Sequence, residues 1–308
     1  MNQRAKNWKS IDEQIEIIRS RGMIIDDKQH AAHFLQRVGY YRLSGYWYPF
    51  RQFNDGNRAN EFTKDSKFED VIALYLFDRK LRLLALDAIE RIELALQVEI
   101  AHLLGERDIF AHENPAQLHG NFSRKRNPND QSNHEKWLKD YNKLVQRSRR
   151  KPFVDHNIKT YGKLPIWVAI EIFDFSTLSK LYSGLKQQDR MKIEAQFGLN
   201  EGNHLHTWLR GLNFIRNTAA HHSRLWNCNV MELANVPRTK LQMHGLKNSR
   251  SFLYFCIMQT MMRIICPDST WKHRFIKLLD RFPNVENEAV KIDDMGIVDG
   301  WKEWQIWR

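Results

Sequence analysis

The fold class follows from FDRKLRLLALDAIERIELAL, residues 77–96. Apolar side chains recur in it every three or four positions, and the same step continues outward to Phe68 and to Leu104. This period is typical of an amphipathic helix that buries one face. We expect these side chains of the helix in the core: Val71, Ile72, Tyr75, Leu76, Leu83, Ile89, Ile92 and Leu96. A helix of this length predicts an all-α protein built as a helical bundle.

The segment before the long helix, residues 1–65, is predicted to hold N-terminal helices and an aromatic loop. Two helices are expected at 11–22 and 26–39, since each segment ends at a glycine. Glycine is the residue preferred just past the end of a helix.

Aromatic side chains crowd residues 40–53, YYRLSGYWYPFRQF, around Gly45 and Pro49. We interpret this segment as a loop, because glycine and proline are strong breakers of regular structure. Its rings either fill the gap between helix layers or, together with Arg42 and Arg51, stack on unpaired RNA bases.

The main predicted domain, residues 66–283, is helical apart from an insertion at about 105–163. Helical patterns resume after Pro165, and two further helices follow within 251–283. No pair of strands is evident in the sequence. The C-terminal tail, residues 284–308, contains three tryptophans, which cover either the core or another subunit.

The insertion is strongly basic in its second half. Residues 124–151 hold ten lysines and arginines against three acids, and clustered cations are what phosphate neutralisation requires. A solvated, partly disordered insertion is the alternative. The RNA-contacting residues that we predict are Arg124, Lys125, Arg126, Arg147, Arg149, Arg150 and Lys151, with Arg210 and Arg224 later in the chain.

The segment richest in candidate catalytic residue types is RNTAAHHSRLWN, residues 216–227. Helical geometry over 209–224 predicts two faces. The apolar face holds Leu212, Ile215, Ala219 and His222. The polar face holds Arg210, Asn213, Asn217, His221 and Arg224. Arg216 lies roughly 140° from His221 around such a helix, so contact between them needs a curling arginine side chain, a helix end near His221, or a second copy of the motif.

These residue types suit RNA cleavage without a metal. Histidine exchanges a proton near neutral pH, and arginine offers a permanent, planar charge to a phosphate. Asparagine can position either group or the ribose 2′-hydroxyl. The alternative is that Asn217 and His221 only cap or hydrogen-bond within a helical core. The segment lacks a cysteine or glutamate nucleophile, which argues against a covalent intermediate.

Four segments of the chain resemble a known family. Arg216, Asn217 and His221 match the signature of HEPN ribonucleases, an arginine and a histidine separated by four to six residues, and RNTAAHHSRLWN resembles the Abi abortive-infection family. The other similar segments, in the expected order, are VGYYRLSGYWYPFR (38–51), FDRKLRLLALDAIERIELAL (77–96) and LPIWVAIEIFDFSTLSKLY (164–182). The resemblance runs from about residue 10 to about residue 282.

This resemblance implies a HEPN-like helical bundle of the D/F type that acts in phage defence. It also implies similarity to the ribonuclease domains of RNA-guided type VI CRISPR effectors. Arg216 and His221 are then the catalytic pair, and Asn217 is the polar residue after the arginine. His222 has no role in the signature and is a possible supporting residue. Two copies of the motif are expected to face each other in a homodimer.

Two acidic residues are further candidates for supporting roles. Glu93, on the polar side of the long helix, either orients the active-site histidine or arginine or makes ordinary surface contacts. Glu171 is the one charge within an apolar run. It is either a buried acid that pairs with an arginine or histidine of the 210–224 stripe, or a surface residue.

The composition favours nucleic acid as a partner. Forty-eight lysines and arginines against thirty-six acids give a net charge of +12, which favours a polyanion, and nucleic acid before a membrane. Three cysteines without CxxC spacing predict reduced thiols in a cytoplasmic protein. No signal peptide, membrane span, zinc motif or phosphate-binding glycine loop is evident. We therefore expect no metal, no cofactor and no membrane contact.

The function expected from these features is metal-independent endoribonuclease activity in phage defence. Such a protein is toxin-like and restrained by a cognate RNA or protein, and its products carry a 2′,3′-cyclic phosphate. The first alternative is a non-catalytic RNA-binding defence subunit regulated by a small RNA. A purely structural oligomer is the second alternative.

Overall fold

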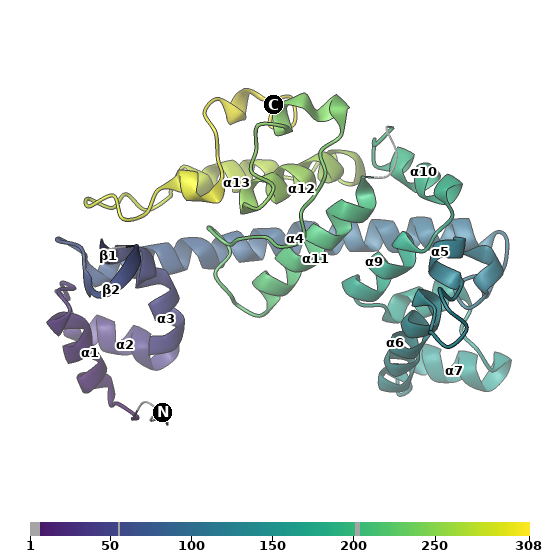
Figure 1. Ribbon diagram of the computed structural model, residues 1–308, viewed down its shortest axis with the longest axis horizontal. Coiled ribbons are helices and arrows are strands. Elements are labelled where there is room, and N and C mark those ends of the chain that lie inside the picture. The colour runs from purple at the N-terminus through teal and green to yellow at the C-terminus, as the bar shows by residue number, and fades with distance from the viewer. Residues whose placement is uncertain (1–6, 55, 201–203) are drawn as a thin grey trace.

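The computed structural model describes residues 7–54, 56–200 and 204–308. Its longest element is the 38-residue helix α4 (Phe68–Gly105), which runs through the middle of the molecule (Figure 1). The prediction of a long helix over 68–104 is therefore confirmed, and so is the all-α class. None of the helices in the described ranges combines the length and the apolar character that crossing a membrane requires.

The other helices and the two strands are distributed along α4 (Figure 1). Their bounds, in chain order, are α1 (Ile11–Ser20), α2 (Lys28–Arg37), α3 (Tyr40–Trp47), β1 (Arg51–Asn54), β2 (Asn57–Phe62), α5 (Gly120–Ser123), α6 (Asn133–Ser148), α7 (Pro152–Tyr161), α8 (Ile166–Ala169), α9 (Phe175–Ser183), α10 (Gln187–Gln196), α11 (Leu205–Ala220), α12 (Ser251–Ile265) and α13 (Trp271–Leu279). Helices α11, α12 and α13 pack against α4.

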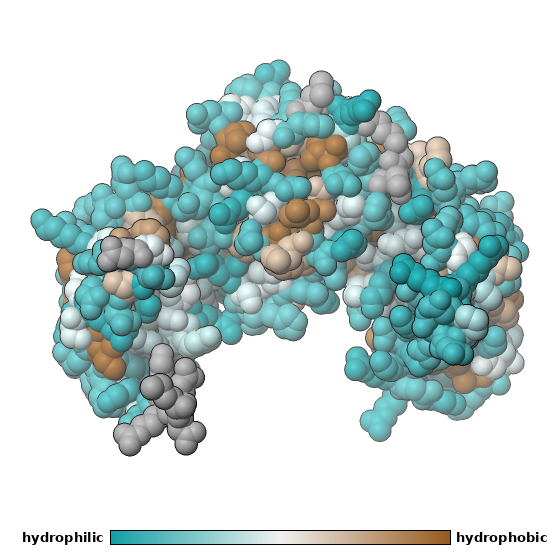
Figure 2. Space-filling model, viewed as in Figure 1, coloured by the Kyte–Doolittle hydropathy of each residue, from teal (hydrophilic) through white to brown (hydrophobic). Residues whose placement is uncertain are grey.

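The molecule has the shape of an arch. Helices α1 to α3 form one end and α5 to α7 form the other, and Figure 2 shows a hollow between them. Helix α11 crosses α4 in Figure 1, and its C-terminal end lies on the side of this hollow. The hollow is therefore the face on which the predicted active-site segment ends.

The segment 40–53 is not the loop that we expected. It forms α3, a short 3-10 turn (Tyr48–Phe50), and β1, which pairs with β2 in an antiparallel hairpin. The prediction that Gly45 interrupts regular structure was wrong. Leu43, Tyr46, Trp47 and Phe50 are spaced three or four residues apart or adjacent, as on one helix face, and all four are buried. Burial of that face outweighs the low helix propensity of one glycine.

The core of α4 follows the predicted step with two exceptions. Val71, Ile72, Ile89, Ile92 and Leu96 are buried and Tyr75 is partly buried against the core, whereas Leu76 and Leu83 are exposed. Periodicity alone misplaces these two leucines because it marks an apolar stripe without showing where the neighbouring helices cover it.

The insertion at 105–163 is ordered rather than disordered. A capping box of Ser132 and Glu135 starts α6, which buries Trp137, Tyr141 and Val145. The Trp137 indole donates a hydrogen bond to the Thr177 carbonyl of α9 at 2.9 Å. Amphipathic packing thus holds α6 against the rest of the protein.

Two of the three C-terminal tryptophans cover the core of their own chain. Trp301 and Trp307 are buried, and both rings contact Phe252 and Phe275 of α12 and α13. Of the two alternatives for the tail, the intramolecular one is therefore confirmed for these residues.

A buried carboxylate, Asp78, connects three segments of the fold. Its oxygens accept hydrogen bonds from the Tyr46 hydroxyl of α3 at 2.6 Å and from Arg82 of α4 at 2.5 Å. They also accept hydrogen bonds from the backbone N–H groups of Leu225 and Trp226, at 3.1 and 2.7 Å. Burial raises the pKa of the Asp78 carboxyl, and Arg82 and these hydrogen bonds lower it. All these donors bind the same carboxylate, so removing the Asp78 carboxylate leaves several buried donors without a hydrogen-bond partner.

Replacing Asp78 should destabilise the protein strongly. We expect Asp78→Asn to lower the free energy of unfolding by about 3–5 kcal/mol, because it leaves the Arg82 charge buried without a counter-ion. Asp155→Asn is the matched control, since Asp155 is in an exposed pair with Lys159 and should cost less than about 1 kcal/mol. Urea unfolding measures both, and equal losses for the two variants would contradict the central role of Asp78.

Candidate functional site

Helix α11 carries the predicted polar stripe on a helix whose other face is buried. Leu212, Ile215 and Ala219 lie in the core, as the helical period predicts. On the opposite side, Arg210, Asn213, Asn217 and His221 line one cleft with a volume of about 820 Å³. The stripe is therefore correct for these four residues.

The helix ends at Ala220, before the stripe does. Two hydrogen bonds close it, from the N–H of Ser223 to the Thr218 carbonyl at 2.9 Å and from the N–H of His222 to the Ala219 carbonyl at 3.0 Å. This pair of bonds is the Schellman motif. His222 takes the left-handed position of that motif with φ 59°, where glycine is the usual residue.

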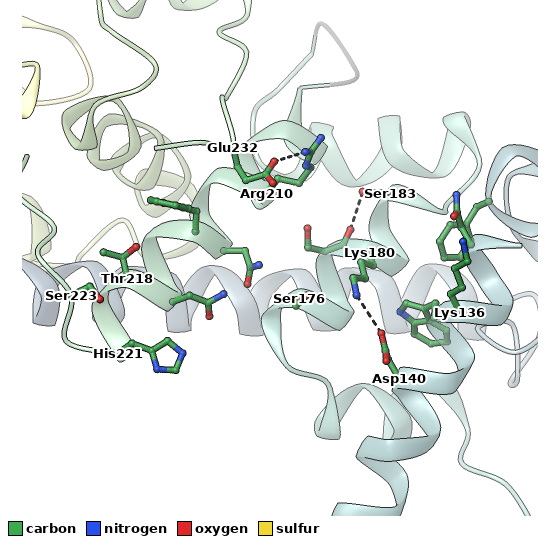
Figure 3. Close-up of a pocket in the computed structure, with 17 residues that line it drawn as sticks. Lys136, Asp140, Ser176, Lys180, Ser183, Arg210, Thr218, His221, Ser223 and Glu232 are labelled. Atoms are coloured by element: carbon green, nitrogen blue, oxygen red, sulfur yellow. Dashed lines mark hydrogen bonds and ion pairs between the residues drawn. The ribbon is translucent and has the colours of Figure 1, made fainter. Parts of the chain in front are cut away.

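This helix end places the two histidines differently from a continuous helix. His221 becomes the C-cap, an exposed residue at the edge of the cleft whose ring points away from α11 in Figure 3. His222 is also exposed, so its predicted place on the apolar face is wrong. Three arrangements that could bring Arg216 and His221 into contact were considered above. The structure contains one of them, a helix end near His221.

The other walls of the cleft come from the basic insertion and from α9. Lys136 and Asp140 project from α6, and Lys180 projects from α9 (Figure 3). Lys180 and Asp140 form an ion pair at 3.3 Å, and Arg210 forms one with Glu232. Most of the remaining lining is uncharged: Asn133, Ser176, Ser179, Ser183, Asn213, Phe214, Thr218 and Ser223 among others.

Arg216 lies beside the cleft lining rather than within it. The half-buried arginine donates a hydrogen bond to the Asn217 side-chain oxygen at 3.1 Å. Glu93 of α4 is its electrostatic partner: burial raises the pKa of the Glu93 carboxyl, and the Arg216 guanidinium lowers it. Arg216 thus acts on Glu93 through its charge, and the alternative in which Glu93 orients the arginine stays a prediction.

Two other predicted site residues lie elsewhere. Glu171 is exposed, so the surface alternative is confirmed and its expected pairing with the 210–224 stripe is wrong. Arg224 lies beyond the helix end and donates to the Gly45 carbonyl of α3. Its place on the cationic stripe was wrong, because the Schellman motif reverses the chain at His222.

The predicted RNA-contacting cations of the insertion lie outside the cleft, in two groups near the two ends of α6 that together are called the basic surface below. All seven are exposed, at the end of α5 and around the junction of α6 and α7: Arg124, Lys125, Arg126, Arg147, Arg149, Arg150 and Lys151. The described residues that line the cleft include none of these seven.

Sequence reasoning placed Arg210 but did not place Lys136 and Lys180 in the cleft, and it missed Asp78, which fixes the chain after His221. Lys136 of α6 and Lys180 of α9 line the same cleft, and residues so far apart in the chain give no local signal that they do so. Asp78 did leave a signal, since it is an acid at a position where the helical step of α4 predicts burial. A buried acid requires partners.

The segment after His221 is fixed from two sides. Asp78 holds Leu225 and Trp226, and Arg42 of α3 donates to the His222 carbonyl at 3.1 Å. The N-terminal helices therefore contribute directly to the position of His221.

A model of the family described as Abi-like protein matches residues 33–227, more than half of the chain. The chain belongs to the Abi-like protein family. The matched part of this Abi-like protein begins in α2 and ends just after Trp226, so it contains Asp78, His221 and the lining of the cleft except Glu232. It is narrower than the expected span of about 10 to 282. Membership of the Abi-like family supports a role in abortive infection, a form of phage defence.

No curated protein and no solved structure matches the Abi-like chain. Within the described residues, no group of three or more histidine, cysteine, aspartate or glutamate side chains is arranged to hold a metal ion.

The left-handed backbone at His222 gives a stability prediction. His222→Gly should raise the free energy of unfolding by up to about 1 kcal/mol, because glycine adopts this conformation without strain. His222→Val should lower it by about 1–2 kcal/mol, since a β-branched side chain is a strong outlier there. Thermal or urea unfolding distinguishes them, and a valine variant as stable as the glycine variant would rule out the turn.

Proposed function

We propose that this Abi-like protein is a metal-independent endoribonuclease of the HEPN superfamily that acts in phage defence. One observation carries the proposal. An exposed imidazole, His221, stands at the edge of a cleft beside Asn217, and Asn217 accepts a hydrogen bond from Arg216. A proton carrier, an amide and a permanent cation thus lie on one helix end.

In the proposed reaction, His221 removes the proton from a ribose 2′-hydroxyl. The 2′-oxygen attacks the adjacent phosphorus, the bond to the 5′-oxygen breaks, and the leaving oxygen takes a proton from the second histidine of the dimer proposed below. The products are a 2′,3′-cyclic phosphate and a 5′-hydroxyl. Arg216 stabilises the negative charge that develops on the phosphoryl oxygens, and Asn217 positions the arginine. Glu93 acts indirectly, by keeping the guanidinium oriented.

The cleft fits a phosphodiester chain better than a neutral ligand. Three cations line it, Lys136, Lys180 and Arg210, against two acids, Asp140 and Glu232, which pair with Lys180 and Arg210 and leave the lining with one net positive charge. Asparagine and serine side chains between them offer donors and acceptors to ribose and base edges. These cations, together with the exposed basic surface on α5 to α7, support RNA as the substrate.

We further propose that two copies of the chain share the active site. One chain supplies a single His221, whereas the reaction needs both a base and an acid, and Arg216 does not line the cleft with His221. A two-fold symmetric dimer supplies the second histidine. Sedimentation equilibrium tests this, and a monomer that cleaves RNA would contradict the shared site.

Replacing His221 should abolish RNA cleavage. General acid–base catalysis contributes about 10²- to 10⁴-fold, so we expect His221→Ala to cleave labelled RNA at least about 100-fold more slowly in the presence of a chelator. His222→Gly is the matched control, because it alters the adjacent imidazole and keeps the turn. It should retain activity.

The result that counts against the proposal is a folded His221→Ala protein that cleaves RNA at the parent rate. If neither parent nor variant cleaves RNA, the non-catalytic RNA-binding alternative replaces the enzyme.

The basic surface should bind RNA phosphates without regard to sequence. Removing its cations should flatten the dependence of RNA affinity on salt, because each cation that neutralises a phosphate of a single strand adds up to about 0.7 to the log–log slope. The four substitutions made together are Arg147→Ala, Arg149→Ala, Arg150→Ala and Lys151→Ala.

Four exposed cations in the C-terminal part of the chain provide the control. The substitutions are Arg263→Ala, Lys277→Ala, Arg281→Ala and Lys302→Ala. They lower the net charge equally and should leave the slope nearly unchanged. Equal slopes for the two quadruple variants would place the RNA-binding surface elsewhere.

A further inference from the structure

Three aromatic rings of the segment 40–53, which forms α3, the 3-10 turn and β1, are exposed, although aromatic residues next to them in the chain are in the core. Tyr41 is 91% exposed, Phe53 64% and Tyr48 48%. Tyr46 and Trp47, within the same ten residues, are at most 1% exposed. The segment therefore fills the core with one set of rings and presents another set to solvent.

Arginine side chains hold two of the exposed rings in place. The Arg58 guanidinium lies 5.9 Å from the centre of the Tyr48 ring and 5.5 Å from that of Phe53. The same guanidinium donates to the Pro49 carbonyl at 2.9 Å, which anchors it to the backbone. Rings fixed in this way lose little conformational freedom when a ligand stacks on them.

This surface adjoins the catalytic segment. Arg42, the residue after Tyr41, donates to the His222 carbonyl, and Gly45 accepts from Arg224. Tyr41 is one helical turn from Gly45. The exposed Tyr41 ring is therefore carried by the same helix that contacts the chain immediately after His221.

The charge around the rings favours a polyanion. Residues 38–62, up to the end of β2, contain three arginines, Arg42, Arg51 and Arg58, and two acids, Asp55 and Glu61. An apolar protein partner would have to bury these guanidinium groups at a cost in desolvation. An unpaired nucleic acid strand instead offers a flat base to each ring and a phosphate to each arginine.

We propose that Tyr41, Tyr48 and Phe53 form a stacking surface for the unpaired bases of single-stranded RNA that enters the site at His221. This inference rests on the proposed function and narrows its substrate to single strands. Duplex RNA keeps its bases stacked within the helix and offers none of them to exposed rings. A second copy of the chain on this surface is the competing occupant.

The experiment measures RNA affinity in a background that cannot cleave. His221→Ala protein is titrated, with anisotropy detection, into a labelled single strand of about ten nucleotides, within the site size of single-strand binders, and into the corresponding duplex. Tyr41→Ala and Tyr41→Phe are added to this background. Trp167→Ala is the control, because Trp167 is an exposed aromatic residue, 49%, on α8 and lies outside both the cleft lining and the basic surface.

Loss of one stacking ring should weaken single-strand binding about five- to hundredfold. Tyr41→Phe should bind like the parent, since it keeps the ring, and the control should too. Duplex affinity should be lower than single-strand affinity and insensitive to Tyr41→Ala. Unchanged single-strand affinity of Tyr41→Ala, or an equal loss on duplex RNA, overturns the proposal.

Two further readouts separate this inference from the proposed function. In the His221-containing protein, Tyr41→Ala should raise KM for single-stranded RNA, and cleavage that is unaffected would overturn the stacking surface while the nuclease stands. If the parent does not cleave RNA but Tyr41→Ala still loses affinity, the nuclease fails and the stacking surface stands. A loss of dimer instead of RNA affinity would assign the surface to a second copy.

Discussion

The buried carboxylate of Asp78 is the interaction on which the geometry of the site depends. It joins α3 through Tyr46, α4 through Arg82, and the backbone after α11 through Leu225 and Trp226. A carboxylate without water is costly to bury, so these partners are all required for it to remain. The chain after His221 consequently has one fixed course, and the imidazole is held at the edge of the cleft without a hydrogen bond of its own to the core.

Much of the fold could be predicted from local period. The step of three or four residues identified α4 and α11, and on α11 it placed Arg210, Asn213 and Asn217 on one side. It failed where a helix end lacks its usual residue. The Schellman motif of α11 has His222 in the glycine position, so the sequence offered a helix end near His221 only as one of three arrangements and did not predict the departure of Arg224 from the stripe. At α3 the error was the reverse: Gly45 predicted a break, and the structure continues as a helix.

The candidate site was predictable only on the helix that carries the motif. Lys136 and Lys180 reach the cleft through the packing of α6 on α9, which depends on Trp137 and other residues distant in sequence. The partnership of Glu93 with Arg216 likewise joins α4 to α11. Periodicity marks such residues as polar but contains no information about which of them meet. The same limit applies to Tyr41, whose exposure only the packing of α3 determines.

Membership of the Abi-like family, a cationic cleft and an imidazole at a fixed helix end together support one claim, metal-independent cleavage by the ribose 2′-hydroxyl. The chemical nature of the cut ends tests that claim most directly. Single-stranded RNA is digested by the purified protein in excess chelator, and the termini are identified by mass spectrometry. The expected products have 2′,3′-cyclic phosphate and 5′-hydroxyl ends. Products with 3′-hydroxyl and 5′-phosphate ends, or cleavage that stops in chelator, would contradict the claim.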